Sequence, residues 1–142
     1  MGHQSMILVL EDQPLISMEL ESLIGDAQLG VVVTMTRCEE AIRWLEENTP
    51  ETAVLDVGLR DGDSRAVAQI LVERGVPFVV HTAREREGDP NCCVFERGTW
   101  IPKLSKPDDL VAAIASALAS ATRGPQPWTS PNEPQMQSSD RA

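Results

Sequence analysis

Short apolar runs alternate with segments of helical periodicity along most of this chain. The runs are too short for helices and contain few polar residues, which is typical of strands buried in a parallel sheet. They lie at 6–10, 30–35, 52–57, 77–81 and 99–102. Between them, apolar residues recur every three or four positions and predict helices at 14–27, 38–48, 64–74 and 107–121. The alternation predicts an α/β fold with a doubly wound, five-stranded parallel sheet.

One helix of this pattern is expected to be weak. The segment before the fifth run contains Gly88, Asp89 and Pro90 among charged side chains, so a short fourth helix is predicted only at 91–97. From Arg123 on, four prolines and several serines and glutamines indicate disorder. We therefore predict one domain over 1–122 and a disordered tail over 123–142.

The charge and the cysteines restrict the partners and the compartment. The formal net charge is −10, and the tail has as many acids as bases, so the excess belongs to the folded part. This argues against nucleic acid or an anionic membrane as a partner. No signal peptide or membrane span is visible. Free thiols and a cytoplasmic protein are expected, since Cys38, Cys92 and Cys93 form no CxxC pattern.

Acidic residues follow two of the predicted strands. Glu11 and Asp12 come directly after the first run, and Asp56 lies near the end of the third. The carboxyl ends of parallel strands meet at one edge of the sheet, where ligands of such folds bind. Carboxylates crowded together there are expected to bind a hard cation or to take part in phosphoryl chemistry. A hydroxyl and a cation, Thr82 and Lys103, end later strands.

In this order and spacing, the residues resemble the receiver domain of two-component response regulators, which has the flavodoxin-like (CheY-like) fold. Asp56 lies 44 residues after Asp12, Thr82 and Ala83 end the fourth strand, and Lys103 ends the fifth. The resemblance extends from about residue 6 to residue 121. It implies a stand-alone receiver that accepts a phosphoryl group from a histidine kinase or phosphotransfer protein and signals to a downstream protein. Such a protein promotes only its own phosphorylation and dephosphorylation.

The resemblance also implies roles for individual residues. Asp56 is expected to be the nucleophile that forms an acyl phosphate, with Thr82 and Lys103 binding phosphoryl oxygens. The ligands expected for Mg²⁺ are the side chains of Glu11, Asp12 and Asp56 and the carbonyl of Gly58. Trp100, three residues before Lys103, occupies the position of the receiver switch aromatic, which works together with the hydroxyl of Thr82.

The lysine is a choice between two residues. Receivers usually show Lys-Pro, which favours Lys106, whereas the position at the end of the fifth strand favours Lys103, and we prefer Lys103. Leu104 stands where the family has proline, and Arg60 replaces another usual proline. Asp61-Gly62 is interpreted as a turn, and Asp63 as a cap of the third helix.

Three other functions fit the residues less well. A haloacid dehalogenase-like phosphohydrolase needs a second aspartate two residues after the first, where Gly58 stands. A pseudo-receiver that binds partners without phosphorylation is less consistent with an intact acceptor, hydroxyl and lysine. A dinucleotide-binding fold is not favoured, since no GxGxxG follows the first strand.

Overall fold

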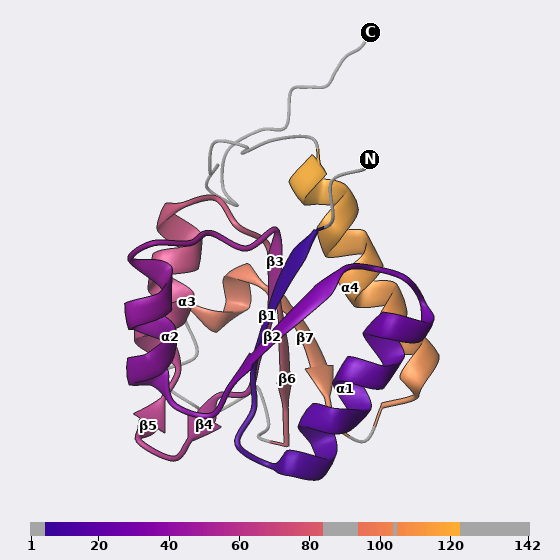
Figure 1. Cartoon of the computed structure of the whole chain (residues 1–142), viewed down its shortest axis with the longest axis horizontal. Coiled ribbons are helices and arrows are strands. Elements are labelled where there is room, and N and C mark those ends of the chain that lie inside the picture. Colours follow the sequence, from indigo (N-terminus) through magenta and orange to yellow (C-terminus); the bar gives the residue numbers. More distant parts are fainter. Residues whose placement is uncertain (1–4, 84–93, 104, 123–142) are drawn as a thin grey trace, which may run out of the picture.

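The computed structural model describes residues 5–83, 94–103 and 105–122, and the expected tail, the Cys92–Cys93 pair and Leu104 lie outside these ranges. A parallel sheet forms the centre of the molecule, with strand order β2-β1-β3-β6-β7 (Figure 1). Its strands are β1 (Met6–Leu10), β2 (Val31–Met35), β3 (Thr52–Leu55), β6 (Phe78–Thr82) and β7 (Thr99–Pro102). Strand β2 lies on one side of β1, and the later strands lie on the other side. Such a topological switch point forms a crevice at the carboxyl edge of the sheet.

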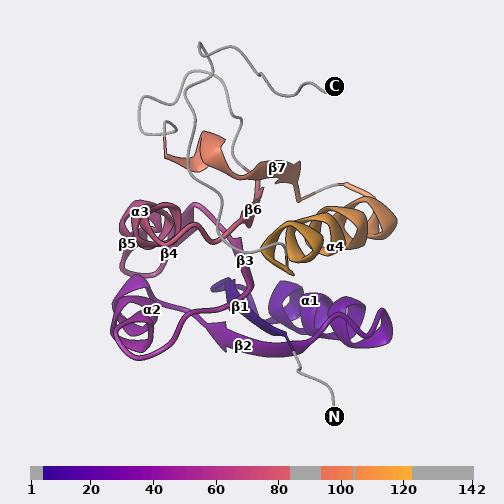
Figure 2. The ribbon, with the colours of Figure 1, turned by 90° about the horizontal axis from the view of Figure 1, so that it is seen from above.

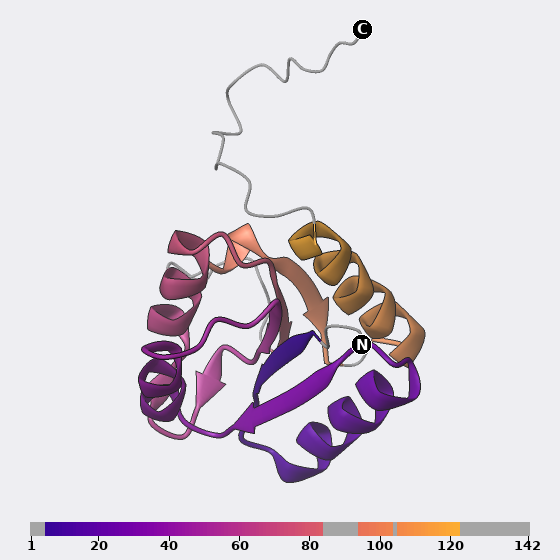
Figure 3. The same ribbon diagram turned by 45° about the horizontal axis from the view of Figure 1, so that its top comes forward.

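Two pairs of helices cover the two faces of the sheet (Figures 2 and 3). One face carries α1 (Pro14–Asp26) and α4 (Pro107–Thr122), and the other carries α2 (Cys38–Leu45) and α3 (Arg65–Glu73). Each pair encloses its own apolar cluster, so the central strands are buried on both sides. This burial on both faces explains why the strands are unbroken apolar runs in the sequence.

Alternate strand residues enter the two clusters. The α1/α4 side includes Ile7, Val9, Val54, Val79, Leu20, Ile24 and Ile114. The α2/α3 side includes Leu8, Leu10, Leu55, Val80, Leu45, Val67 and Leu71. This alternation confirms the predicted fold class and fixes which side chains point to which layer. In the part of the chain that is described, no helix combines the length and the apolar composition that a bilayer crossing needs.

Some predicted boundaries were wrong. Helix α2 ends at Leu45 instead of residue 48, because the N–H groups of Glu46 and Glu47 bond the carbonyls three residues back, and the side-chain amide of Asn48 also donates to the Trp44 carbonyl (3.0 Å). Strand β3 ends at Leu55 instead of residue 57. The Ser64 hydroxyl donates to the Asp56 carbonyl (2.7 Å), so this carbonyl faces the loop and not a neighbouring strand.

Two short elements complete the described fold. A hairpin of two short antiparallel strands, β4 (Gly58–Leu59) and β5 (Gly62–Asp63), follows Asp56, and its turn lies at residues 60–61, one residue before the expected turn. The expectation of a weak fourth helix at 91–97 is confirmed, because the described part of this segment forms only a single 3₁₀ turn at Phe95–Arg97, and residues 91–93 lie outside the described ranges. Gly98 follows it, and a Cβ there would meet the Phe78 ring at 2.6 Å, so the chain must pass close to β6 at this point.

Candidate functional site

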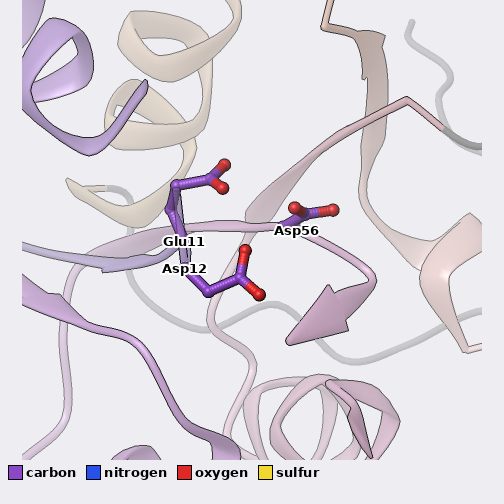
Figure 4. Close-up of side chains that lie close together, drawn as sticks. All are labelled: Glu11, Asp12 and Asp56. Atoms are coloured by element: carbon purple, nitrogen blue, oxygen red, sulfur yellow. The ribbon is translucent and has the colours of Figure 1, made fainter. Parts of the chain in front are cut away.

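Three carboxylates gather at the carboxyl edge of the sheet. Glu11 and Asp12 follow β1, Asp56 follows β3, and one oxygen from each lies within 4.8 Å of the others (Figure 4). Backbone bonds hold the two strand ends, because the Glu11 N–H donates to Met35 (3.1 Å) and the Asp56 N–H donates to Leu10 (3.0 Å). Glu11 and Asp56 are buried, whereas Asp12 is half-buried. The parallel ladder therefore brings together the acids that the sequence placed at its strand ends.

Lys103 reaches into this cluster from the end of β7. Its backbone N–H donates to the Thr82 carbonyl (3.0 Å), which continues the β6–β7 ladder by one residue. Its ammonium lies 2.7 Å from Asp56 Oδ2, 3.1 Å from Glu11 Oε1 and 3.0 Å from Gln13 Oε1. Lys106 is exposed, and its carbonyl accepts the N–H groups of Asp109 and Leu110 at the start of α4. Of the two candidate lysines, the structure places Lys103 in the cluster.

Burial and neighbouring charges together shift the pKa of Glu11 and of Lys103. Burial raises the pKa of Glu11, and the Asp56 charge raises it further, against the N–H of Gln13 (3.1 Å) and the Lys103 ammonium. Burial alone would lower the pKa of Lys103, but its bonds and charge interactions with Asp56 and Glu11 outweigh this and raise it. The ammonium is thus held protonated beside three carboxylates. Such an excess of negative charge favours the binding of a further cation.

A cavity of about 270 Å³ opens beside these groups. It is lined by Asp12, Gln13, Asp56, Gly58, Thr82, Ala83 and Lys103. Carboxylate and carbonyl oxygens are the ligands that Mg²⁺ prefers, so the donor set fits this ion, and the cavity leaves room for a phosphoryl group. Most of the site residues expected from the sequence thus line this cavity, whereas Glu11, which is buried, and Trp100 do not.

Thr82 and Trp100 lie on neighbouring strands. Thr82 is the last residue of β6 and is buried, and Trp100 is the register partner of Val80, two residues before Thr82. Trp100 is half-buried and packs against the α2/α3 side of the core. His81, next to Thr82 in β6, points to the opposite face of the sheet and is buried; burial, followed by the Lys103 charge, lowers its pKa.

Several contacts of the site were not foreseen. Gln13 bonds Lys103, and the Ser64 hydroxyl bonds the carbonyl of Asp56. Asp63 does accept the Arg65 N–H at the start of α3 (3.1 Å), although Ser64 occupies the N-cap position itself. The sequence offers no periodic signal for the contacts of Gln13 and Ser64, because each joins residues outside the helices and strands.

Comparison with known proteins agrees with this geometry. A family model described as the response regulator receiver domain matches residues 7–115. The chain belongs to this family. Receiver domains are signalling domains and not a class of enzyme, and they interact with histidine kinases or phosphotransfer proteins.

This receiver domain is similar to the following proteins in sequence or in fold. It is 38% identical over 118 residues to the phyllosphere-induced regulator PhyR of Methylorubrum extorquens, covering 79% of this chain and 43% of the relative, so the chain spans less than half of that protein. It is 32% identical to SdrG from Sphingomonas melonis Fr1, whose solution structure matches with a TM-score of 0.67. The match covers 83% of this chain and 99% of that one. A sensor kinase receiver domain from Pseudomonas aeruginosa PAO1, with magnesium coordinated in its active site cleft, shares the fold at 22% identity and a TM-score of 0.70, with 82% and 99% covered.

Proposed function

We propose that this receiver accepts a phosphoryl group on Asp56 from a histidine kinase or phosphotransfer protein in the cytoplasm and signals through a change of its surface. The observation that carries the proposal is the contact of 2.7 Å between Lys103 and Asp56 Oδ2, beside two further carboxylates and an open cavity. An acceptor carboxylate needs this combination of a neighbouring cation and room for the incoming group.

Asp12, Glu11, Asp56 and the carbonyl of Gly58 are the groups that would hold Mg²⁺. When bound, the ion supplies charge neutralisation at the phosphoryl oxygens. The rest of the chemistry belongs to the side chains. A carboxylate oxygen of Asp56 forms the new bond to phosphorus, while the bond from phosphorus to the donor nitrogen breaks and the nitrogen keeps the electron pair. Lys103 and Thr82 bind oxygens of the transferred group, and the product is an acyl phosphate.

The surface next to the cavity suits a protein donor. Leu15 and Met18, at the start of α1, are 80% and 62% exposed and follow Gln13, which lines the cavity. Large exposed apolar side chains beside a functional site are typical of protein contacts. They support a protein, and not only a small molecule, as the source of the phosphoryl group.

The proposal is tested by incubating the protein with Mg²⁺ and a small phosphodonor and weighing it intact. We expect a mass increase of one phosphoryl group that disappears on alkaline treatment, because acyl phosphates hydrolyse readily. If Mg²⁺ binds and neither a small donor nor a purified kinase gives an adduct, the protein is a phosphorylation-independent adaptor instead.

A second expected result concerns signalling. The phosphoryl oxygens are proposed to draw the Thr82 hydroxyl toward the cavity, and Trp100, on the same face of the neighbouring strand, then changes its packing. In a variant with Trp44 and Trp128 changed to Phe, beryllofluoride with Mg²⁺ should shift Trp100 emission. The shift should be lost in Thr82→Ala. Constant emission while the mimic binds would show that Trp100 is a fixed packing residue.

A further inference from the structure

Helix α2 receives its N-terminal cap from a distant loop. The residue at its N-cap position, Arg37, makes no capping bond. Instead, Asp61 Oδ1 accepts the Cys38 N–H (2.8 Å) and Asp61 Oδ2 accepts the Glu39 N–H (3.0 Å). One carboxylate thus satisfies two of the free N–H groups at the start of the helix, where a negative charge is also favourable. These N–H groups lower the pKa of Asp61, so it is ionised at neutral pH.

Asp61 belongs to the turn of the β4–β5 hairpin, which also carries Gly58. The hairpin meets α2 at a second point, since the Cys38 thiol donates to the Asp63 carbonyl (3.0 Å). In the register of the hairpin, Asp63 is the partner of Gly58. A short path of direct contacts therefore leads from the first residue of α2 to Gly58, which lines the site cavity.

The hairpin needs such an anchor. It has two residue pairs, and an isolated two-stranded hairpin is at best marginally stable in water unless it packs against another element. Glycines at residues 58 and 62 add backbone freedom, and freedom that remains in a loop must be given up when the loop binds a ligand. Ser64 fixes the far end of the loop through its bond to the Asp56 carbonyl, but this bond leaves the turn of the hairpin unattached.

We propose that Asp61 is a positioning residue of the metal site: by tying the hairpin to α2, it holds the Gly58 carbonyl ready beside Asp12 and Asp56. The inference rests on the proposed function, because it requires that Mg²⁺ binds at this cavity. It assigns Asp61 no contact with the metal. Its effect passes through the backbone of the hairpin, and so depends on the two hydrogen bonds more than on its charge.

The test compares Mg²⁺ affinities, measured by calorimetry under conditions in which every variant is folded. Asp61→Ala removes both bonds and is expected to weaken Mg²⁺ binding about tenfold, the lower range for residues that orient metal ligands. Asp61→Asn keeps one acceptor oxygen, and asparagine is a good cap, so it should recover part of the affinity. Hydrogen exchange at the amides of Cys38 and Glu39 reports directly whether the bonds are lost.

Two control variants distinguish a positioning effect from a change in charge and from a general loss of stability. Glu39→Gln removes a carboxylate from the same end of α2 but leaves both Asp61 bonds, which involve the backbone N–H of Glu39. Thr52→Val removes a buried bond to the Pro77 carbonyl (2.7 Å) at the opposite end of β3, and so lowers stability away from the site. Both should bind Mg²⁺ like the wild type.

Three results would count against the inference. Equal losses of affinity in Asp61→Ala and Glu39→Gln would assign the effect to charge. Unchanged affinity in Asp61→Ala would refute the positioning role. Failure of the wild type to bind Mg²⁺ would instead overturn the proposed function, and the inference with it.

Discussion

Asp56→Asn is expected to reduce phosphoryl uptake to background, with a small donor and with a kinase. The amide has almost the same shape as the carboxylate but lacks the charged oxygen that attacks phosphorus. Asp56 is buried and lies within 2.7 Å of Lys103, so no other carboxylate among the described residues has the same access to that cation and to the cavity. Intact mass after incubation with Mg²⁺ and donor is the measurement.

The loss of labelling must be separated from a loss of structure. Lys103 keeps its contacts with Glu11 and Gln13 in Asp56→Asn, and one of three crowded charges is removed, so the fold should be retained. Circular dichroism and urea unfolding test this directly. Asp26→Asn, at the exposed end of α1, is a matched control that should label like the wild type. Undiminished labelling of Asp56→Asn would move the acceptor to another residue.

The sequence was sufficient for the sheet and for the strand-end residues of the site. Runs that are apolar on both sides belong in the middle of a parallel sheet, and parallel strands place their carboxyl ends at one edge, so Glu11, Asp12 and Asp56 had to meet there. The preference for Lys103 over Lys106 has the same physical basis. Lys103 directly follows β7, and its N–H continues the ladder, whereas Lys106 lies beyond a loop at the start of α4.

The surroundings of the site were not predictable in this way. The β4–β5 hairpin has strands of two residues, too short to give an alternating pattern, and its tie to α2 joins residues 23 apart in sequence. At the early end of α2 the backbone changes to bonds between residues three apart, and the side chain of Asn48 adds a bond to the Trp44 carbonyl, neither of which apolar periodicity predicts. Phe95 is buried by contacts with the α2/α3 side of the core, so tertiary packing and not local propensity determines the 3₁₀ turn around it.

Asp12→Ala is expected to have opposite effects on metal binding and on stability. Asp12 is half-buried beside Glu11 and Asp56, and Lys103 forms its contacts with those two acids and with Gln13. The charge of Asp12 therefore adds repulsion to the metal-free cluster. Removing it should weaken Mg²⁺ binding at least about tenfold. In metal-free buffer of low ionic strength, it should also raise the free energy of unfolding, by up to about 1 kcal/mol.

Urea unfolding with and without Mg²⁺ measures both effects. A ligand that binds only the folded state stabilises it in proportion to the logarithm of its concentration, so added Mg²⁺ should stabilise the wild type and leave Asp12→Ala almost unchanged. Glu11→Ala provides the contrast, because Glu11 is buried and bonds Lys103, and its loss should lower the metal-free stability. Equal stabilisation of wild type and Asp12→Ala by Mg²⁺ would place the ion elsewhere. Lower metal-free stability of Asp12→Ala would show that Asp12 stabilises the fold even without a cation, against the expected repulsion from Glu11 and Asp56.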